Sequence, residues 1–464
     1  MAITDRLAAH IASVRYEDLP PAVVAATKRL IMDTLGTGYA GGGEPGCAEV
    51  ADTVLADGTA PHATLWSTGE RTSVMGAALV NGTCAAALDY DSLHFDGVIH
   101  PEIVTVPAAL ALGEREGRSG RDLIKAVAVG GDLMCRLAMS TGRNSAWFVT
   151  STNGTFGAAA SAAIMLGLNQ TQSREALGLA LCQASGTIQA VLEKTLAKRM
   201  QSAFAARSGV LAAELARRDV TGPVEAIEGK AGYYAAFEAG DADILLADLG
   251  QNYETLNTGI KKFPSCACNH AAIQAAIDLA RDHAIYLENP ERIRVRITPY
   301  MQQVVGGAFD PSGDLQVAAQ FSVKYSVACA LLRRELVLSD LTRDRVLEPR
   351  VRALADRVEV ELDPVNTGFL TPATVVVEAG GKVFERTVDA VPGSAQAPLS
   401  DREVANKFQD CMSYGRSRGT MIDASRLFDD LSALEEVENL NAMMSAVFAP
   451  ARQTPARSTH AARS

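Results

Sequence analysis

Histidine is scarce in this chain, with only 7 among 464 residues. No His-x-x-x-His pair occurs, and Cys266-Ala267-Cys268 has no matching second pair, so no zinc site of the usual spacing is predicted. The 8 cysteines are scattered, and several fall in apolar helical stretches. That distribution predicts reduced core thiols rather than a disulfide framework. We therefore expect neither a metal site nor disulfide bonds.

Long apolar runs and an excess of positive charge are also missing. No stretch reaches the roughly 18 apolar residues that span a bilayer, and the N-terminal segment has no signal-peptide core. The net charge of −11 argues against nucleic acid as the main partner, because phosphate binding needs a basic field. No Walker loop, Rossmann glycine fingerprint or Gly-x-Ser-x-Gly elbow occurs. A cytoplasmic enzyme with no membrane partner is the expected class.

Two kinds of hydrophobic pattern divide the chain. Helical patterns follow one another to about residue 259, whereas later segments alternate polar and apolar residues as half-buried strands do. Two such segments flank Gly380-Gly381 and predict a β-hairpin in a small antiparallel sheet. The expected fold is mainly α with an α+β part, namely a large all-helical domain and a smaller α+β lid domain. We expect its segments to be residues 1–262 (helical), 263–399 (lid), 400–450 (return to helix) and 451–464 (disordered tail).

The densest group of proton-transfer residues lies in Leu88-Asp89-Tyr90-Asp91-Ser92-Leu93-His94, followed by His100-Pro101. It comes after an alanine-rich stretch, 75–88, that fits a packed helix. Carboxylates and imidazoles at a helix end can exchange protons near neutral pH when their surroundings adjust their pKa values. The structural alternative is that the acids cap the helix end and the histidines only pack.

Further segments carry side chains that suit an acidic ligand, although each also has a purely structural explanation. Cations at a helix start oppose the helix dipole, and lysines beside a helix N-terminus favour a carboxylate. The alternatives are solvated cations, a charged linker, a core tyrosine and a simple N-cap. The residues concerned are Lys198 and Arg199; Lys261, Cys266 and His270; Ser322 and Tyr325; and Thr152.

Taken in order, these segments resemble the MmgE/PrpD family, which contains 2-methylcitrate dehydratases, cis-aconitate decarboxylases and an iminodisuccinate epimerase. The resemblance covers roughly residues 7–408. It rests on Asp33-Thr34-Leu35-Gly36, Asn81-Gly82, Leu88-Asp89-Tyr90-Asp91, His100-Pro101, Gly154-Thr155-Phe156-Gly157, Lys198, Lys261-Lys262-Phe263-Pro264-Ser265-Cys266 and Phe321-Ser322-Val323-Lys324-Tyr325. The resemblance implies a homodimer with a helical domain, an α+β lid and no cofactor or metal.

The resemblance also implies which residues form the site. The expected catalytic residues are Asp89, His100, Lys198, Lys261 and Tyr325. The expected substrate-binding residues are Asp91, His94, Thr152, Arg199, Cys266, His270 and Ser322.

This chain departs from the family pattern mainly by having fewer histidines. Ser151 and Cys266 stand where many members or the decarboxylases carry histidine, and Lys198-Arg199-Met200-Gln201 replaces Lys-x-Leu-His. Asp91-Ser92 stands where many relatives have Asp-Asp. These losses argue against decarboxylation and also weaken plain citrate-type dehydration. They leave intact the step common to the family, which is proton exchange on a carbon next to a carboxylate.

We therefore expect an enzyme that binds a small di- or tricarboxylate, with dehydration of a 2-methylcitrate-like hydroxy acid as the first expectation. Lys198 and Lys261 would hold the developing enediolate charge. His100 or Asp89 would be base and acid, and Tyr325 would donate to a carboxylate or a leaving hydroxyl. The alternatives are an iminodisuccinate-like epimerase, a cis-aconitate-type decarboxylase, and a non-catalytic dimeric binding or scaffold protein.

Overall fold

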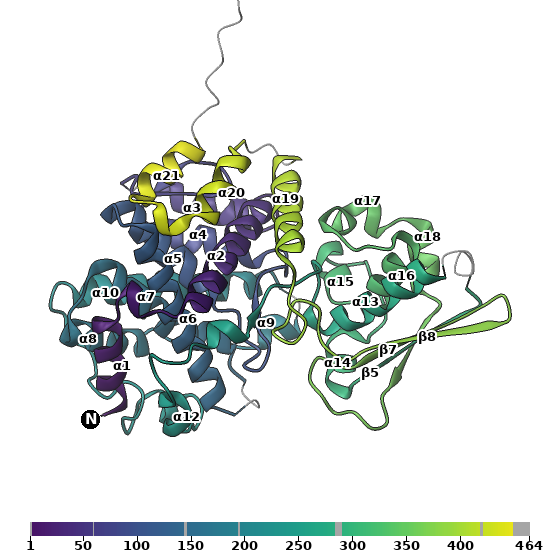
Figure 1. Cartoon of the computed structure of the whole chain (residues 1–464), viewed down its shortest axis with the longest axis horizontal. Coiled ribbons are helices and arrows are strands. Elements are labelled where there is room, and N and C mark those ends of the chain that lie inside the picture. Colours follow the sequence, from purple (N-terminus) through teal and green to yellow (C-terminus); the bar gives the residue numbers. More distant parts are fainter. Residues whose placement is uncertain are drawn as a thin grey trace, which may run out of the picture.

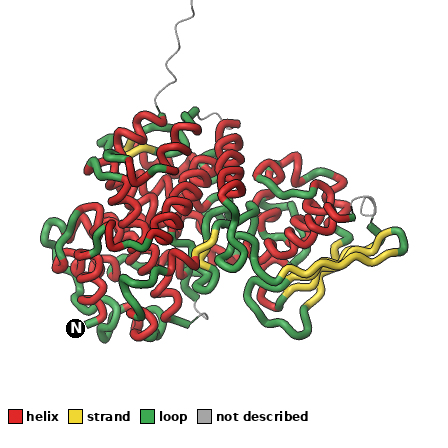
Figure 2. Tube along the Cα trace, in the orientation of Figure 1, coloured by secondary structure: helices red, strands yellow, loops and turns green. Residues whose placement is uncertain are grey.

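The computed structural model describes residues 2–58, 60–142, 146–193, 195–283, 290–417 and 421–448. Two parts lie side by side (Figure 1), a larger helical one and a smaller one that holds most of the strands (Figure 2). The mainly helical fold with a smaller α+β part, expected from the sequence, is confirmed. None of the described helices is long and apolar enough to cross a membrane. The expected disordered tail, 451–464, lies outside the described residues.

Six long, alanine-rich helices form the centre of the helical part. Small residues let these helices approach closely: a Cβ on Gly209 would lie 2.4 Å from the Cβ of Ala158 on the neighbouring helix. The remaining helices pack around this centre, and α19 packs along α2. The central helices are α2 (Pro21–Gly41), α4 (Val74–Ala86), α5 (Glu102–Glu116), α6 (Gly120–Ser140), α7 (Val149–Leu166) and α10 (Ala197–Ala216). The surrounding helices include α1 (Ile3–Ser13), α3 (Cys47–Ala56), α8 (Gln170–Leu181), α19 (Asp401–Ser417), α20 (Ala424–Ser432) and α21 (Leu440–Val447).

The smaller part packs helices on a four-stranded sheet with the strand order β6-β5-β7-β8. The hairpin expected around Gly380-Gly381 is confirmed, and both glycines adopt positive φ. The expectation of a purely antiparallel sheet is wrong, because β5 pairs with β6 in parallel. The strands are β5 (Arg292–Ile297), β6 (Val358–Leu362), β7 (Ala373–Ala379) and β8 (Lys382–Val388); the helices include α13 (Ala267–Asp282), α14 (Pro299–Val305), α16 (Val323–Arg333) and α18 (Pro349–Ala355).

Short elements connect the two parts around the segment that follows α4. The strand β3 (Leu93–His94) pairs with β4 (Thr258–Gly259), which precedes α13. From the lid side, the amide of Gln320, at the end of α15 (Leu315–Gln320), donates to the Leu88 carbonyl at 2.7 Å. Residues 87–100 therefore lie between the helical part and the lid, where both can contribute side chains to one site.

Candidate active site

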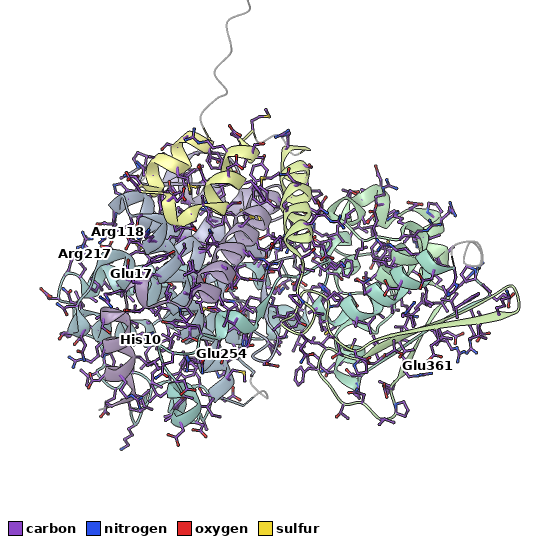
Figure 3. The ribbon with its side chains drawn as sticks, viewed as in Figure 1. His10, Glu17, Arg118, Arg217, Glu254 and Glu361 are labelled. Atoms are coloured by element: carbon purple, nitrogen blue, oxygen red, sulfur yellow. The ribbon has the colours of Figure 1, made fainter. Side chains whose placement is uncertain are left out.

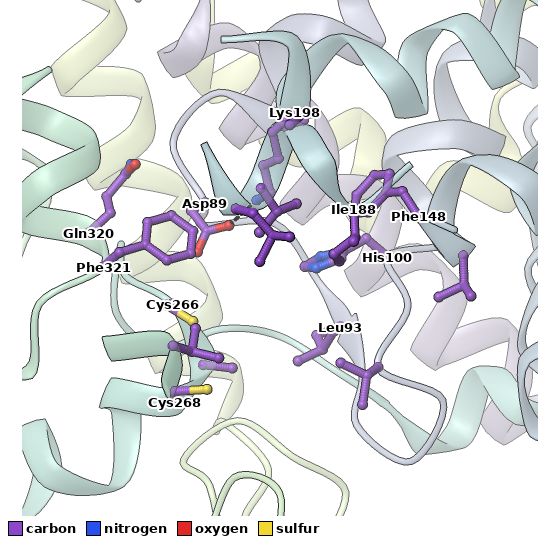
Figure 4. Close-up of a pocket in the computed structure, with 18 of the residues that line it drawn as sticks. Asp89, Leu93, His100, Phe148, Ile188, Lys198, Cys266, Cys268, Gln320 and Phe321 are labelled. Carbon is purple, nitrogen blue, oxygen red and sulfur yellow. Dashed lines mark hydrogen bonds and ion pairs between the residues drawn. The ribbon is translucent and has the colours of Figure 1, made fainter. Parts of the chain in front are cut away.

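A cavity of about 530 Å³ lies between the helical part and the lid (Figure 4). Six of the expected site residues line it, and they come from both parts of the molecule. They are Asp89, His100, Lys198, Arg199, Lys261 and Cys266. A cavity between two domains is a common place for a small-molecule site.

Asp89 is the centre of the charged corner of this cavity. It follows α4 in a left-handed conformation, with φ of 50°, which Asp tolerates better than most residues. Lys198 Nζ lies 2.6 Å from its Oδ1, and Lys261 Nζ lies 3.3 Å from its Oδ2. Lys261 Nζ also donates to the Asp89 carbonyl oxygen at 2.9 Å. Two lysines from distant segments are thus fixed by one acid.

The charges in this corner keep Asp89 ionised. Burial alone would raise the pKa of Asp89, but the ammonium groups of Lys198 and Lys261 outweigh it and hold this pKa far below its usual value. Burial alone would lower the pKa of Lys261, but the carboxylates of Asp89 and Asp91 raise it above its usual value. Asp89 is therefore a poor proton acceptor at neutral pH. Its role in this geometry is to position two cations that together exceed its own charge.

His100 is positioned by a second acid, Asp91. Its Nδ1 lies 2.7 Å from Asp91 Oδ2 and 3.0 Å from the carbonyl oxygen of Ser92. Neither oxygen can donate a proton, so Nδ1 carries the proton and donates to the Ser92 carbonyl, and Nε2 is the basic nitrogen. Burial would raise the pKa of Asp91, but His100 and Lys261 lower it overall, so Asp91 stays ionised. A carboxylate in this position fixes the orientation of the imidazole ring.

A buried layer of acids and one lysine supports the segment that carries Asp91. The Ser92 hydroxyl donates to Glu102 at 2.5 Å, and burial raises the pKa of Glu102 to about 7. Lys407 Nζ lies 2.6 Å from Asp33 and donates to the Tyr90 carbonyl, also at 2.6 Å. Sequence reasoning missed Glu102 and Lys407 as parts of the site. The position of Glu102 directly after His100-Pro101 was the available signal.

Several expected site residues lie outside the cavity. His94 is fully buried, and its Nε2 lies 3.1 Å from the carboxylate of Glu254, which is labelled in Figure 3. His270 is also buried, its Nε2 lies 3.2 Å from the Ser265 carbonyl, and burial together with Lys261 lowers its pKa to about 3. Neither imidazole is therefore placed to exchange protons with a ligand in this cavity.

The hydroxyl residues expected at the site are also placed elsewhere. Tyr325 is buried in the lid core, and its hydroxyl donates to the Asp340 carbonyl at 2.5 Å. Ser322 caps α16 by accepting from the Tyr325 amide, and Thr152 is buried within α7. The sequence placed Ser322 and Tyr325 on a helix but could not show that these side chains face the lid interior.

Among the described residues, no group of three or more His, Cys, Asp or Glu side chains could hold a metal ion. The positive charge of the cavity comes instead from Lys198, Lys261 and Arg199. Of these, Arg199 donates to the Pro45 carbonyl at 2.8 Å. Lys262 does not line the cavity and pairs with Glu403 at 2.9 Å. The two lysines on Asp89 are thus the best placed cations for an anionic ligand.

Comparisons with known proteins agree with this architecture. The MmgE/PrpD N-terminal domain family matches residues 5–244, and the MmgE/PrpD C-terminal domain family matches residues 263–425. The chain belongs to the MmgE/PrpD family. Similar curated MmgE/PrpD proteins include the cis-aconitate decarboxylase of Homo sapiens, 27% identical over 96% of this chain and 94% of the relative. Those of Mus musculus (26%; 96% and 93%) and Aspergillus terreus (24%; 94% and 92%) are also similar.

Proposed function

We propose that this MmgE/PrpD protein is a cofactor-independent lyase that transfers a proton to or from a carbon next to a carboxylate of a small di- or tricarboxylic acid. The observation that carries the proposal is the pairing of two units in one cavity. One unit is the Lys198–Asp89–Lys261 cluster, and the other is the Asp91–His100 pair. The first suits a substrate carboxylate, and the second suits a proton donor or acceptor.

Decarboxylation is the first candidate reaction. The bond between the carbon and the departing CO₂ breaks, and its electron pair moves into the remaining substrate, where charge collects on a carboxylate held by Lys198 and Lys261. The imidazolium form of His100 then adds a proton to carbon, and solvent restores that proton. The names of the relatives support this candidate. These names stand against the expectation, drawn from the missing histidines, that argued against decarboxylation.

Dehydration of a 2-methylcitrate-type hydroxy acid is the second candidate. Neutral His100 would remove the proton next to the carboxylate, and the hydroxyl would leave as water after accepting a proton from the cationic side of the cavity. Lys198 favours this candidate because its ammonium group lies at the cavity wall and is partly accessible, with 22% of its side chain exposed. Proton transfer alone, without a leaving group, would give the epimerase alternative.

The test is product analysis on a panel that includes cis-aconitate and 2-methylcitrate. Release of CO₂ identifies decarboxylation, a new conjugated double bond with retained carbon number identifies dehydration, and a change in optical rotation alone identifies epimerisation. His100→Ala should abolish whichever reaction is found, whereas His62→Ala, at an exposed loop position, should not. Absence of all three reactions across the panel would favour the non-catalytic binding protein and contradict the proposal.

A further inference from the structure

We infer that the substrate carries an apolar alkyl substituent, which binds in a region of the cavity beyond His100. This inference rests on the proposed function and narrows its substrate class. The region, which we call the apolar arm, is formed by Leu93, Phe148, Val149, Ile188 and Val191, and all five side chains line the cavity. In Figure 4, Phe148 and Ile188 lie beside His100 on one side of the pocket, and Asp89 and Lys198 lie on the other.

Hydrogen bonds bring the walls of the apolar arm together. The Phe148 amide donates to the Gly186 carbonyl at 3.1 Å, and the Ile188 amide donates to the Ala146 carbonyl at 2.9 Å. These bonds hold the segment before α7 against the segment that opens α9 (Gln189–Leu192). Two apolar side chains that lie 40 positions apart in the sequence are thereby placed on the same side of the cavity.

His100 is connected to both sides of the apolar arm. Its main-chain amide donates at 3.4 Å to the hydroxyl of Thr150, the second residue of α7, which follows Phe148. Its ring lies 3.0 Å from the carbonyl of Ser92, the neighbour of Leu93. A group attached to the carbon that reacts at His100 therefore has the arm directly beside it.

The chemistry of the arm favours an alkyl group over a further carboxylate. Phe148, Val149, Ile188 and Val191 are only half-buried, so an apolar occupant would remove their exposed surface from water. An ionised carboxylate in the arm would lose hydration beside these aliphatic and aromatic walls, which is costly without a paired cation. The cavity, at about 530 Å³, falls in the range of roughly 300–1,000 Å³ typical of drug-sized ligands, so a short acid would fill only part of it.

The inference is tested by calorimetric binding of succinate, methylsuccinate, butylsuccinate and hexylsuccinate to the whole protein. The Kd should fall about fourfold for each added methylene until the arm is filled, which is the ratio expected for burying one CH₂. Ile188→Trp fills the arm, so it should raise the Kd of butylsuccinate at least tenfold. It should change the Kd of succinate less than twofold. Ile244→Trp, at a 47% exposed position outside the cavity lining, is the matched control and should bind the series as the unaltered protein does.

Ile188→Ser provides a second variant in case the tryptophan prevents folding, and it should weaken only the longer homologues. A Kd that stays level or rises with chain length would overturn the inference. The proposed function would survive that result if succinate still binds and Lys261→Ala abolishes its binding. Failure of every acid in the series to bind would overturn both.

Discussion

The three lysines near the domain junction offer a direct comparison between buried, cavity-lining and external cations. Lys261 has only 2% of its side chain exposed, and it contacts both the carboxylate and the main chain of Asp89. Removing one partner of a buried ion pair costs about 3–5 kcal/mol, and Lys198 would still neutralise part of the remaining charge. We therefore expect Lys261→Ala to lower the free energy of unfolding by roughly 2–4 kcal/mol.

The same variant should lower kcat/KM by roughly 30- to 900-fold, which corresponds to about 2–4 kcal/mol for an unpaired substrate carboxylate in a desolvated cleft. Lys198→Ala should lower kcat/KM by a similar factor but cost less stability, because 22% of this side chain is exposed. Lys262→Ala breaks the half-exposed pair with Glu403, which is worth about 0–1 kcal/mol, and should leave kcat/KM within twofold.

The assays are steady-state kinetics on the best substrate of the panel and urea unfolding of each variant. Unfolding separates a loss of substrate binding from a loss of folded protein, since Lys198→Ala should show mainly the first. A large loss of kcat/KM in Lys262→Ala, with little loss in Lys261→Ala, would refute the assignment of cations to the cavity.

Three further results are expected. Tyr325→Phe should keep kcat within twofold and lower the free energy of unfolding by about 1 kcal/mol, because its hydroxyl bonds to Asp340 inside the lid; a large kinetic loss would return Tyr325 to the site. Prolonged dialysis against EDTA should leave activity unchanged, because lysines supply the charge; recovery on adding a divalent ion would contradict this. Burial raises the pKa of Glu102 from 4.5 to about 7, so its contribution to stability is fully present below pH 4.5 and is lost as the pH rises through 7. Urea unfolding from pH 4.5 to 8 should therefore show the unaltered protein losing stability relative to Glu102→Gln. If the two free energies of unfolding differ by the same amount at every pH, the raised pKa of Glu102 is contradicted.

Local patterns in the sequence predicted local structure well, whereas they could not predict contacts between distant segments. The hairpin around Gly380-Gly381 follows from alternation and turn chemistry within fifteen residues. The parallel pairing of β5 and β6 joins strands about 60 residues apart, and nothing in either strand encodes the direction of its partner. The resemblance placed Lys198, Lys261 and Asp89 at one site, but neither it nor the spacing predicted the ion pairs that join both lysines to Asp89.

Side-chain direction was the second limit. Tyr325 was placed correctly on a helix, but its buried face could not be distinguished from a face toward the site. Phe148 and Ile188 gave no signal at all, because each lies in a short irregular segment whose partner is distant in the sequence. His100 was recognised because histidine is rare and an acidic segment lies close before it.

Deuterium incorporation tests most directly whether His100 exchanges a proton with a carbon next to a substrate carboxylate. The reaction is run in D₂O with the best substrate, and product and unreacted substrate are examined by NMR. Deuterium is expected on that carbon of the product for decarboxylation, and on that carbon of the unreacted substrate for reversible dehydration or epimerisation, in the unaltered protein and in His62→Ala. His100→Ala should lose both turnover and exchange with unchanged unfolding. Decarboxylation that leaves no deuterium on that carbon, or exchange that persists in His100→Ala, would contradict this role of His100.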